Sequence, residues 1–371
     1  MHDFRPRFCP WPACPEHRRT RSRLPVRRHG AYFSRRGRRI PRFLCLLCRR
    51  TFSQNSFSLL YYLKRPELLR PVAALLQAGA ANRQIARSMG CAPSTVTRLS
   101  ARLGRHALLL HARALAALPS PLVEPVVLDH FEIFEFTQDC PFGVATVVGA
   151  RSWFWYLLDP APHRRSGKVS VFQARRLARR PPRPRFGGYR GSAHRVFDQL
   201  HRLAGPQQLE VRSDDHPAYA AAAPGRSIRL RRFRNPDRAP KGAPRSPAAR
   251  VRDQALFPVD ALHQLLRHSG AHYRRETLAF GRRLNAILER LFLTAVWRNF
   301  VKPLSENRPR RGTPAMRLRL ARRPWDWQHV LARRLFPGRE TLPPLWQVLY
   351  RRDWPTPVLP RIVTHRLKHA Y

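Results

Sequence analysis

Lysine is almost missing from this chain: of its 71 Lys and Arg residues, the lysines are only Lys64, Lys168, Lys241, Lys302 and Lys368. Acidic residues are also few, since 22 Asp and Glu leave the 371 residues with a formal net charge of +49. Such a charge excludes a housekeeping enzyme of small-molecule metabolism and indicates a polyanionic partner. Arginine would supply nearly all the contacts to that partner.

Long apolar runs are absent as well. No stretch approaches the ~18 apolar residues of a membrane span, and the Arg-rich N-terminus lacks the apolar core of a signal peptide. We therefore expect a soluble intracellular protein with no membrane partner. With 43% hydrophobic and 10% aromatic residues, the chain still has enough apolar mass for a core. At roughly 100–200 residues per domain, its length suggests two to four domains.

Cysteine is scarce too, but four of the six cysteines are paired by spacing. Cys9 and Cys14 form a C-x4-C pair, and Cys45 and Cys48 form a C-x2-C pair. Two such pairs, separated by a stretch long enough to turn back, can place four thiolates around Zn²⁺ at about 2.3 Å. This predicts a zinc ribbon, and accidental pairs of buried cysteines are the alternative.

The composition of residues 1–50 favours the metal. This stretch holds 15 Arg and two acids, with too few aliphatic residues to form a core without a cross-link. His17 is a possible substitute for one thiol. Cys91 and Cys140 are isolated, and we expect them to be ordinary packing residues.

A run of helical patterns follows. Apolar residues of 67–77 fall on one helix face, a second helix begins near Asn82, and Ser94 can cap a third helix over 95–103. Small polar and arginine side chains on the free face of the third helix are typical of a helix-turn-helix that reads DNA. A plain three-helix bundle is the alternative. The predicted DNA-binding residues are Ser94, Thr95, Thr97, Arg98 and Arg102.

From residue 121 onward, short β-branched and aromatic runs predict a sheet. One run ends in Asp129, and another, over 208–211, leads to Asp214. Carboxylates at strand ends converge at one edge of an α/β sheet, where metal-dependent chemistry is commonly placed. Either aspartate taken alone is more often an ordinary loop residue.

The joint order of these motifs resembles that of bacterial insertion-sequence transposases of the DDE class. Nearly the whole chain is covered, including the stretches VVLDHFEIFEF, SDDHPAY, HYRRETLAFGRR, AVWRNFVKPLSEN and RGTPAM. The resemblance implies an α/β, ribonuclease H-like core, a mixed five-stranded sheet flanked by helices, with three carboxylates that bind two divalent cations. Asp129 matches the first acid. Asp214 matches the second, because SDDHPAY is similar to the family's Ser/Thr-Asp-Gly-x-Pro-x-Tyr stretch.

Three residues compete for the third acid. Glu276, expected to open an Arg-rich helix, is the first choice, and Glu289 and Asp260 are its rivals. Asp260 lies about seventeen residues before Thr277, a spacing that one related group of the family uses. A carboxylate among the arginines of HYRRETLAFGRR can instead be their ion-pair partner.

The predicted layout has four parts. A zinc ribbon (1–55) and an all-α helix-turn-helix domain (64–115) precede the catalytic core (121–305), and a basic C-terminal tail (306–371) follows it. Within the core, 220–255 is expected to be a basic loop or insertion, because it is rich in Pro and Arg.

The implied function is that of a transposase. It would bind insertion-element ends and cut and join DNA strands by in-line displacement, with Mg²⁺ or Mn²⁺ at the acids and structural Zn²⁺ at the cysteines. Its partners would be double-stranded DNA, at the element ends and the target, and a further copy of the chain, because two ends must meet. It would act in the bacterial cytoplasm, at the nucleoid.

Two other classes remain open. A decayed or domesticated copy would be a catalytically inactive DNA-binding regulator that has lost the metal site. An RNA-binding protein would expose an aromatic platform for base stacking. The aromatic residues here lie within strand-like runs, which disfavours that class.

Overall fold

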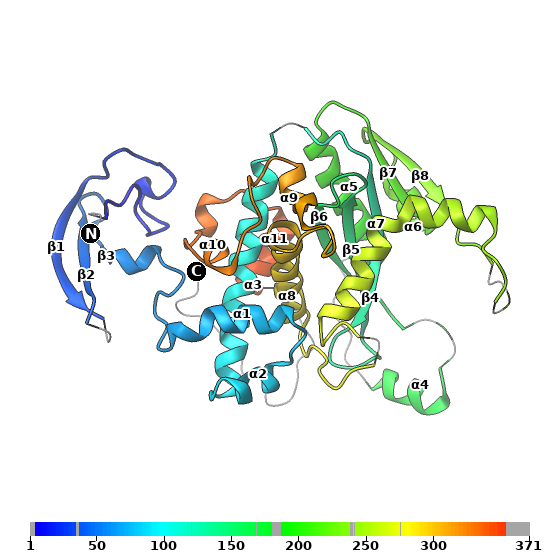
Figure 1. The fold of residues 1–371 in the computed structure, drawn as a ribbon, viewed down its shortest axis with the longest axis horizontal. Coiled ribbons are helices and arrows are strands. Elements are labelled where there is room, and N and C mark those ends of the chain that lie inside the picture. The colour runs from blue at the N-terminus through cyan, green and yellow to red at the C-terminus, as the bar shows by residue number, and fades with distance from the viewer. Residues whose placement is uncertain are drawn as a thin grey trace.

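The computed structural model describes residues 4–353, except 35–36, 120, 166, 168, 180–186, 238–239, 241 and 275. Two sheets and a set of helices make up the described chain (Figure 1). A small three-stranded sheet lies at one end of the molecule, a mixed five-stranded sheet lies toward the other, and a group of helices stands between them.

The small sheet is antiparallel and has the order β1-β2-β3. Its strands are β1 (Val26–Phe33), β2 (Arg39–Cys45) and β3 (Thr51–Ser53). Its core contains six buried side chains, Cys9, Cys14, Leu24, Phe43, Cys45 and Phe52. So small a core cannot hold this segment by apolar burial alone.

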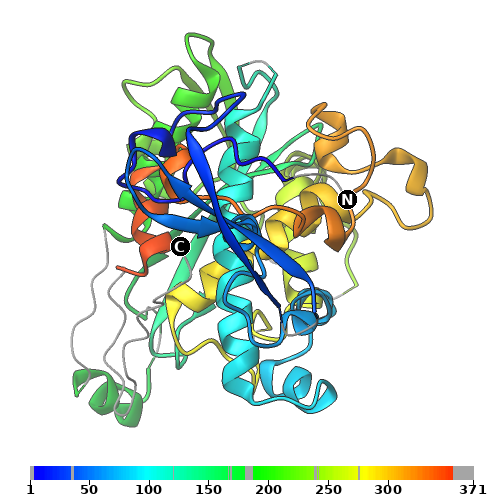
Figure 2. The same cartoon turned by 90° about the vertical axis from the view of Figure 1, so that its left-hand side faces the viewer.

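The small sheet rests on the C-terminal part of the chain, and Figure 2 views the molecule from that side. The Phe336 ring lies 5.3 Å from the Phe8 ring and 5.9 Å from the Phe57 ring. Arg339 stacks its guanidinium over Phe8 at 3.8 Å and donates a hydrogen bond to the Arg19 carbonyl at 3.0 Å. Residues far apart in the sequence thus form the surface on which this sheet packs.

Three helices follow the sheet: α1 (Leu69–Gln77), α2 (Asn82–Ser88) and α3 (Pro93–Ala116). All three were predicted, but the third is longer than expected and begins at Pro93. Ala92 occupies its N-cap position and Ser94 is exposed within its first turn, so the predicted Ser94 cap is wrong. Proline at the first helical position accounts for the earlier start, because it lacks the N–H that a cap would satisfy.

The second half of α3 crosses α8 (Leu284–Val296) in the interior. A Cβ added at Gly104 would lie 2.3 Å from the Glu289 carbonyl oxygen, so glycine is what lets the two helices approach this closely. Arg290 of α8 also donates to Ser100 (3.2 Å) and to Asn82, which ties α2 and α3 to the interior. The first half of α3 remains outside this contact, with exposed Ser94, Thr97 and Arg98.

The large sheet has the order β6-β5-β4-β7-β8. β4, β5 and β6 are antiparallel, whereas β7 and β8 run parallel to β4. Leu128 of β4 pairs with Ser213 of β7, so Asp129 and Asp214 are the next residues along these two strands. The strands are β4 (Val126–Phe134), β5 (Pro141–Gly149), β6 (Trp155–Pro162), β7 (Leu209–Asp214) and β8 (Ile228–Phe233).

Helices cover both faces of this sheet. His130 of β4 contacts Ser192 and Tyr219, which belong to α5 (Gly188–Ala204) and α6 (Pro217–Ala222). Its neighbour Asp129 reaches His263 of α7 (Pro247–Ser269) instead. Because successive side chains of a strand point to opposite faces, α7 covers the face opposite to α5 and α6.

The region 220–255 was predicted to be a basic loop or insertion, but it also holds regular structure. It contains β8 and the beginning of α7. β8 is an edge strand, and its arginines Arg229, Arg231 and Arg232 are exposed there. Because these positions are charged, the pattern of apolar residues did not predict this strand.

The expected helix opening at Glu276 is absent from the described part of 270–283. Local turns replace it, because the Thr277 hydroxyl donates to the Ala271 carbonyl (2.7 Å) and accepts from the Ala279 N–H (2.9 Å). Between β6 and α5, a further helix, α4 (Val171–Ala178), projects from the sheet (Figure 1).

Residues 306–353 of the expected tail pack on the body, and 354–371 lie outside the described residues. Trp346 is buried, and its indole N–H donates to the Leu158 carbonyl at 3.3 Å. This segment contains α9 (Pro314–Arg317), α10 (Trp327–Val330) and α11 (Pro344–Arg351). One apolar core therefore runs from Leu59 to Tyr350.

None of the helices in the described part of the chain is long and apolar enough to cross a bilayer. Several short helical turns complete the described chain. The π-helical turn that follows α8 is Trp297–Val301. The 3-10 turns are Pro15–His17, Gln54–Phe57, Pro66–Leu68, Pro309–Arg311 and Pro337–Arg339.

Candidate active site and metal centre

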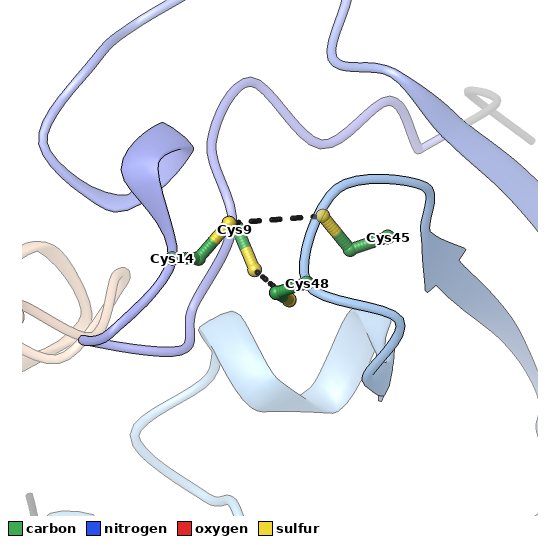
Figure 3. Close-up of side chains that lie close together, drawn as sticks. All are labelled: Cys9, Cys14, Cys45 and Cys48. Atoms are coloured by element: carbon green, nitrogen blue, oxygen red, sulfur yellow. Dashed lines mark hydrogen bonds between the residues drawn. The ribbon is translucent and has the colours of Figure 1, made fainter.

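The four cysteines predicted as metal ligands come together beside the small sheet (Figure 3). The Sγ atoms of Cys9 and Cys48 are 3.7 Å apart, those of Cys14 and Cys45 are 3.8 Å apart, and all four lie within 4.8 Å of one another. A tetrahedral ion with metal–sulfur bonds of about 2.3 Å requires sulfurs about 3.8 Å apart. The cluster can therefore hold a structural metal such as zinc.

The surroundings of the thiols differ in their effect on ionisation. Burial raises the pKa of Cys9 and of Cys14. Burial acts in the same direction on Cys45, but hydrogen bonds from the Cys48 and Leu47 backbone and from neighbouring thiols lower the pKa of Cys45 overall. Backbone N–H groups aimed at sulfur favour the thiolate, which is the form that binds metal.

His17 lies beside this cluster but is not part of it. Its Nδ1 is 2.9 Å from the Cys9 carbonyl oxygen, and four cysteines already complete the group. Cys140 is buried and Cys91 packs against the main core, as expected of packing residues.

The second candidate site gathers acids from three elements. Asp129 lies within β4, Asp214 ends β7, and Asp260 lies on α7. Burial and, after it, the negative charges of Asp214 and Asp260 together raise the pKa of Asp129 to about 7. These three carboxylates are thus close enough to repel one another.

Asp260 is the candidate third acid that the structure brings to the other two. Burial raises its pKa, and the charge of Asp214 acts in the same direction. Arg252, one of the cations on α7, offsets this through a contact of 2.5 Å between its Nη1 and Asp260 Oδ2. One guanidinium beside three carboxylates leaves the group net negative.

Glu276 and Glu289 lie elsewhere. Glu276, the first choice for the third acid, is exposed in the turns between α7 and α8. Glu289 is buried in α8 and accepts two hydrogen bonds from Arg352, each 2.7 Å long. Glu276, the preferred candidate, thus lacks the helix that would have carried it to the sheet, whereas its rival Asp260 lies near Asp129.

The carboxylates are spread more widely than the thiols. Among the described residues, only the cysteine cluster brings three or more Cys, His, Asp or Glu ligand atoms all within 4.8 Å of one another. A site for two cations about 3.5–4 Å apart needs its outer ligands farther apart than a single-ion site does.

A pocket of about 670 Å³ adjoins Asp260 and is lined by α7 and β4. Its wall carries both signs of charge. Three arginines, Arg245, Arg252 and Arg267, line it together with three acids, Glu132, Asp253 and Asp260. His263 also lines it and lies 3.6 Å from Asp129, between its Nδ1 and the carboxylate Oδ2. His263 was not among the sequence-predicted residues, although its spacing of three from Asp260 places both on one helix face.

The predicted DNA-binding residues differ in their availability. Ser94 and Arg98 are exposed, and Thr95 is half-buried. Thr97 is exposed, but its hydroxyl donates to the Pro93 carbonyl (3.0 Å) and accepts from Asn82 (3.1 Å). These four side chains lie on the outer half of α3.

Arg102 does not belong with them. Its guanidinium donates to the Leu59 carbonyl at 2.8 Å and to the Tyr61 carbonyl at 2.7 Å. The prediction that Arg102 contacts DNA is therefore not supported. Its hydrogen bonds instead connect α3 to the segment around Leu59 and Tyr61, which follows the small sheet.

No protein-family model matches the chain, and neither does any curated protein. The chemistry of the side chains is therefore the guide to function. Four thiols suit a closed structural metal site, whereas carboxylate oxygens are the ligand type that hard divalent ions prefer.

Proposed function

We propose that the chain is a DDE-class transposase, an enzyme that cuts and joins DNA strands with divalent cations. The observation that carries this proposal is the gathering of Asp129, Asp214 and Asp260 from three elements. Burial, and with it the charges of Asp214 and Asp260, raises the pKa of Asp129 to about 7. Half-buried carboxylates that repel one another fit Mg²⁺ or Mn²⁺, because a cation relieves the repulsion and prefers hard oxygen ligands.

The topology supports a ribonuclease H-like core. Three antiparallel strands followed by two strands parallel to β4, with helices on both faces, match the mixed five-stranded sheet that the resemblance implies. The acids follow in chain order from β4, from its parallel neighbour β7, and from α7, the helix after the last strand. Distant parts of the sequence therefore supply one site.

The chain's own residues would prepare this site for DNA. The His130 backbone N–H donates to Asp129 Oδ1 at 2.7 Å, which orients that carboxylate. Arginines of the pocket place positive charge where a phosphodiester backbone can lie. Bound divalent cations supply activation of the attacking hydroxyl and stabilisation of the leaving oxygen. No covalent enzyme intermediate is needed.

The N-terminal modules would recognise the DNA. We assign the cysteine cluster to a zinc ribbon and α2 with the outer half of α3 to a helix-turn-helix. The exposed Ser94 and Arg98 lie on the free face of α3, as expected for a helix that enters a major groove. Double-stranded element ends are the proposed substrate, and two copies of the chain would bring them together.

Cleavage of the element's own ends tests the proposal. We expect Mg²⁺-dependent or Mn²⁺-dependent nicking by the wild type, and its loss in Asp129→Asn and in Asp260→Asn. Two variants serve as matched controls. Asp198→Asn alters an acid of α5 that lies outside the pocket lining and pairs with Arg226, and Glu276→Gln alters the exposed rival. Both should cleave like the wild type.

Equal cleavage by the wild type and Asp129→Asn would refute the catalytic site. Binding of the ends without any cleavage by the wild type would favour the alternative function, a non-catalytic DNA-binding regulator. Loss of cleavage in Glu276→Gln with retention in Asp260→Asn would restore Glu276 as the third acid.

A further inference from the structure

His263 is held against the acid group by contacts on two sides. It lies three residues after Asp260 on α7, and its ring packs 5.1 Å from the Phe131 ring. Its Nε2 is 2.7 Å from the Thr146 hydroxyl, and its Nδ1 is 3.6 Å from Asp129 Oδ2. The ring therefore has one nitrogen directed at a hydroxyl and the other at a carboxylate.

The Thr146 hydroxyl decides which nitrogen carries the proton. Thr146 pairs with Asp129 across β4 and β5, and its hydroxyl donates to the Asp129 carbonyl oxygen at 3.0 Å. A hydroxyl has a single proton to donate. Both contacts are hydrogen bonds only if His263 donates its Nε2 proton to the Thr146 oxygen.

In that tautomer the Nδ1 of His263 carries a lone pair and faces the Asp129 carboxylate. Two acceptors that face each other at 3.6 Å repel, and the distance exceeds that of a hydrogen bond. A cation between them would bind both. Metal-bound histidines commonly have the second ring nitrogen fixed by a hydrogen bond, which is the role that Thr146 plays here.

We propose that His263 is a fourth protein ligand of the divalent-cation site, through Nδ1, and that it gives the site a preference for Mn²⁺ over Mg²⁺. This inference rests on the proposed function, because it places the cation at Asp129. Imidazole nitrogen is a good ligand for first-row transition metals, whereas Mg²⁺ takes oxygen ligands almost exclusively. Thr146 acts as a positioning residue, since it reaches the cation only through His263.

Spin-echo EPR of Mn²⁺ bound to the full chain tests the ligand directly. We expect ¹⁴N modulation from the His263 ring in the wild type. The modulation should disappear in His263→Asn, whose amide oxygen replaces Nδ1 as an oxygen ligand. His268→Ala, an exposed histidine on the same helix, should leave the signal unchanged.

Titrations of free Mn²⁺ by EPR, with Mg²⁺ as competitor, test the selectivity. We expect His263→Ala to weaken Mn²⁺ binding by about tenfold or more, the scale found when even an outer partner of a metal site is lost. Mg²⁺ binding should change far less. Thr146→Val removes the acceptor for Nε2 and should weaken Mn²⁺ in the same selective manner, whereas Thr146→Ser should retain wild-type affinity.

The outcomes separate this inference from the proposed function. Mn²⁺ bound without ¹⁴N modulation in the wild type, at a site that Asp129→Asn abolishes, would overturn the role of His263 and leave the acid site intact. Unchanged Mn²⁺ binding in Asp129→Asn would overturn the acid site, and the inference with it. Circular dichroism of each variant, with His263→Asn as the conservative replacement, verifies folding.

Discussion

Among single residues, two buried histidines of α3 make contacts that hold the interior together. His106 and His111 both lie in the inner half of α3, and each has its Nε2 2.8 Å from a backbone carbonyl oxygen, that of Val330 and that of Tyr156 respectively. Each contact joins α3 to a distant segment, so both rings must remain in place for the core to close. Burial lowers the pKa of both histidines to about 4.

Stability should therefore fall in acid. Each ring stays neutral in the folded chain down to about pH 4, but takes up a proton below about pH 6.5 once the chain unfolds. The stabilisation is thus complete above pH 6.5 and is lost as the pH falls toward 4. We expect each histidine to contribute about 1.4 kcal/mol per pH unit to the loss in free energy of unfolding, measured by urea denaturation.

His111→Gln provides the control. Glutamine can still donate an N–H to the Tyr156 carbonyl but cannot take up a proton. The free energy of unfolding of this variant should depend less steeply on pH than that of the wild type. Between pH 6 and pH 4.5 the slope should be smaller by about 1.4 kcal/mol per pH unit, which corresponds to the uptake of one proton fewer on unfolding. An identical slope in the two proteins would contradict the assignment of a neutral, buried His111.

The candidate acids show how far single residues could be predicted. Asp129 and Asp214 were found because each ends or follows an apolar run that is visible in the sequence. Asp260 was only a rival, because the spacing that favours it belongs to one related group of the family. The strand before its helix, β8, has three arginines among its six residues and lay within the stretch taken for a basic loop or insertion. Because that strand was missed, the sequence did not show that the helix after it brings a third acid near Asp129 and Asp214.

At the scale of elements, the small sheet depends on its cysteines. Its six-residue core includes three of them, and the main core begins only at Leu59. A segment with so little apolar burial usually needs a metal or another cross-link to fold. The small sheet and the main body are therefore expected to respond differently to chelation.

Loss of the metal should unfold the small sheet selectively. Chelation, or the double change Cys45→Ser and Cys48→Ser, should remove one equivalent of zinc and expose residues 4–57 to protease. The core from Leu59 to Tyr350 should keep its cooperative unfolding transition. Zinc content by mass spectrometry and limited proteolysis measure the two effects.

Cys91→Ser is the matched control, because this thiol lies on the main core and outside the cluster. It should retain one equivalent of zinc and a protected N-terminal sheet. Stoichiometric zinc in the double variant would refute the assignment of these cysteines as ligands.

Periodicity predicted most elements but not their limits. Apolar spacing located α1, α2, α8 and the strands β4 to β7, because each of them buries one or both faces. It placed the end of α3 near residue 103, whereas the helix continues to Ala116. Arg105 and His106 are buried in this stretch, so a reading based on apolar residues alone lost the pattern there.

At the scale of the whole molecule, the dominant property is the charge of +49. It is distributed over distant parts of the chain, including the small sheet, the outer half of α3 and the edge strand β8. A polyanion that touches several of these parts would release many counterions on binding.

DNA binding should accordingly weaken steeply with salt. If six to ten phosphates are contacted, the affinity should fall by about 10³–10⁵ between 50 and 200 mM salt. Arg98→Ala should reduce the slope of log K against log salt by about 0.9, because one phosphate contact is lost. Fluorescence anisotropy with labelled duplexes measures both quantities.

Arg102→Ala separates phosphate contact from folding. Its guanidinium is engaged with the Leu59 and Tyr61 carbonyls, so the change should lower thermal stability while the salt slope stays at the wild-type value. A reduced slope in Arg102→Ala, with Arg98→Ala unaffected, would mean that α3 presents a different face to DNA.

The packing of the small sheet on Phe336 and Arg339 has a consequence for biosynthesis. Phe8 emerges from the ribosome more than 300 residues before Phe336 and Arg339, the two side chains against which it packs. The small sheet thus has no docking surface until both of these side chains have been translated. The four cysteines can meet well before that point, because Cys9 and Cys48 are only 39 residues apart in the chain.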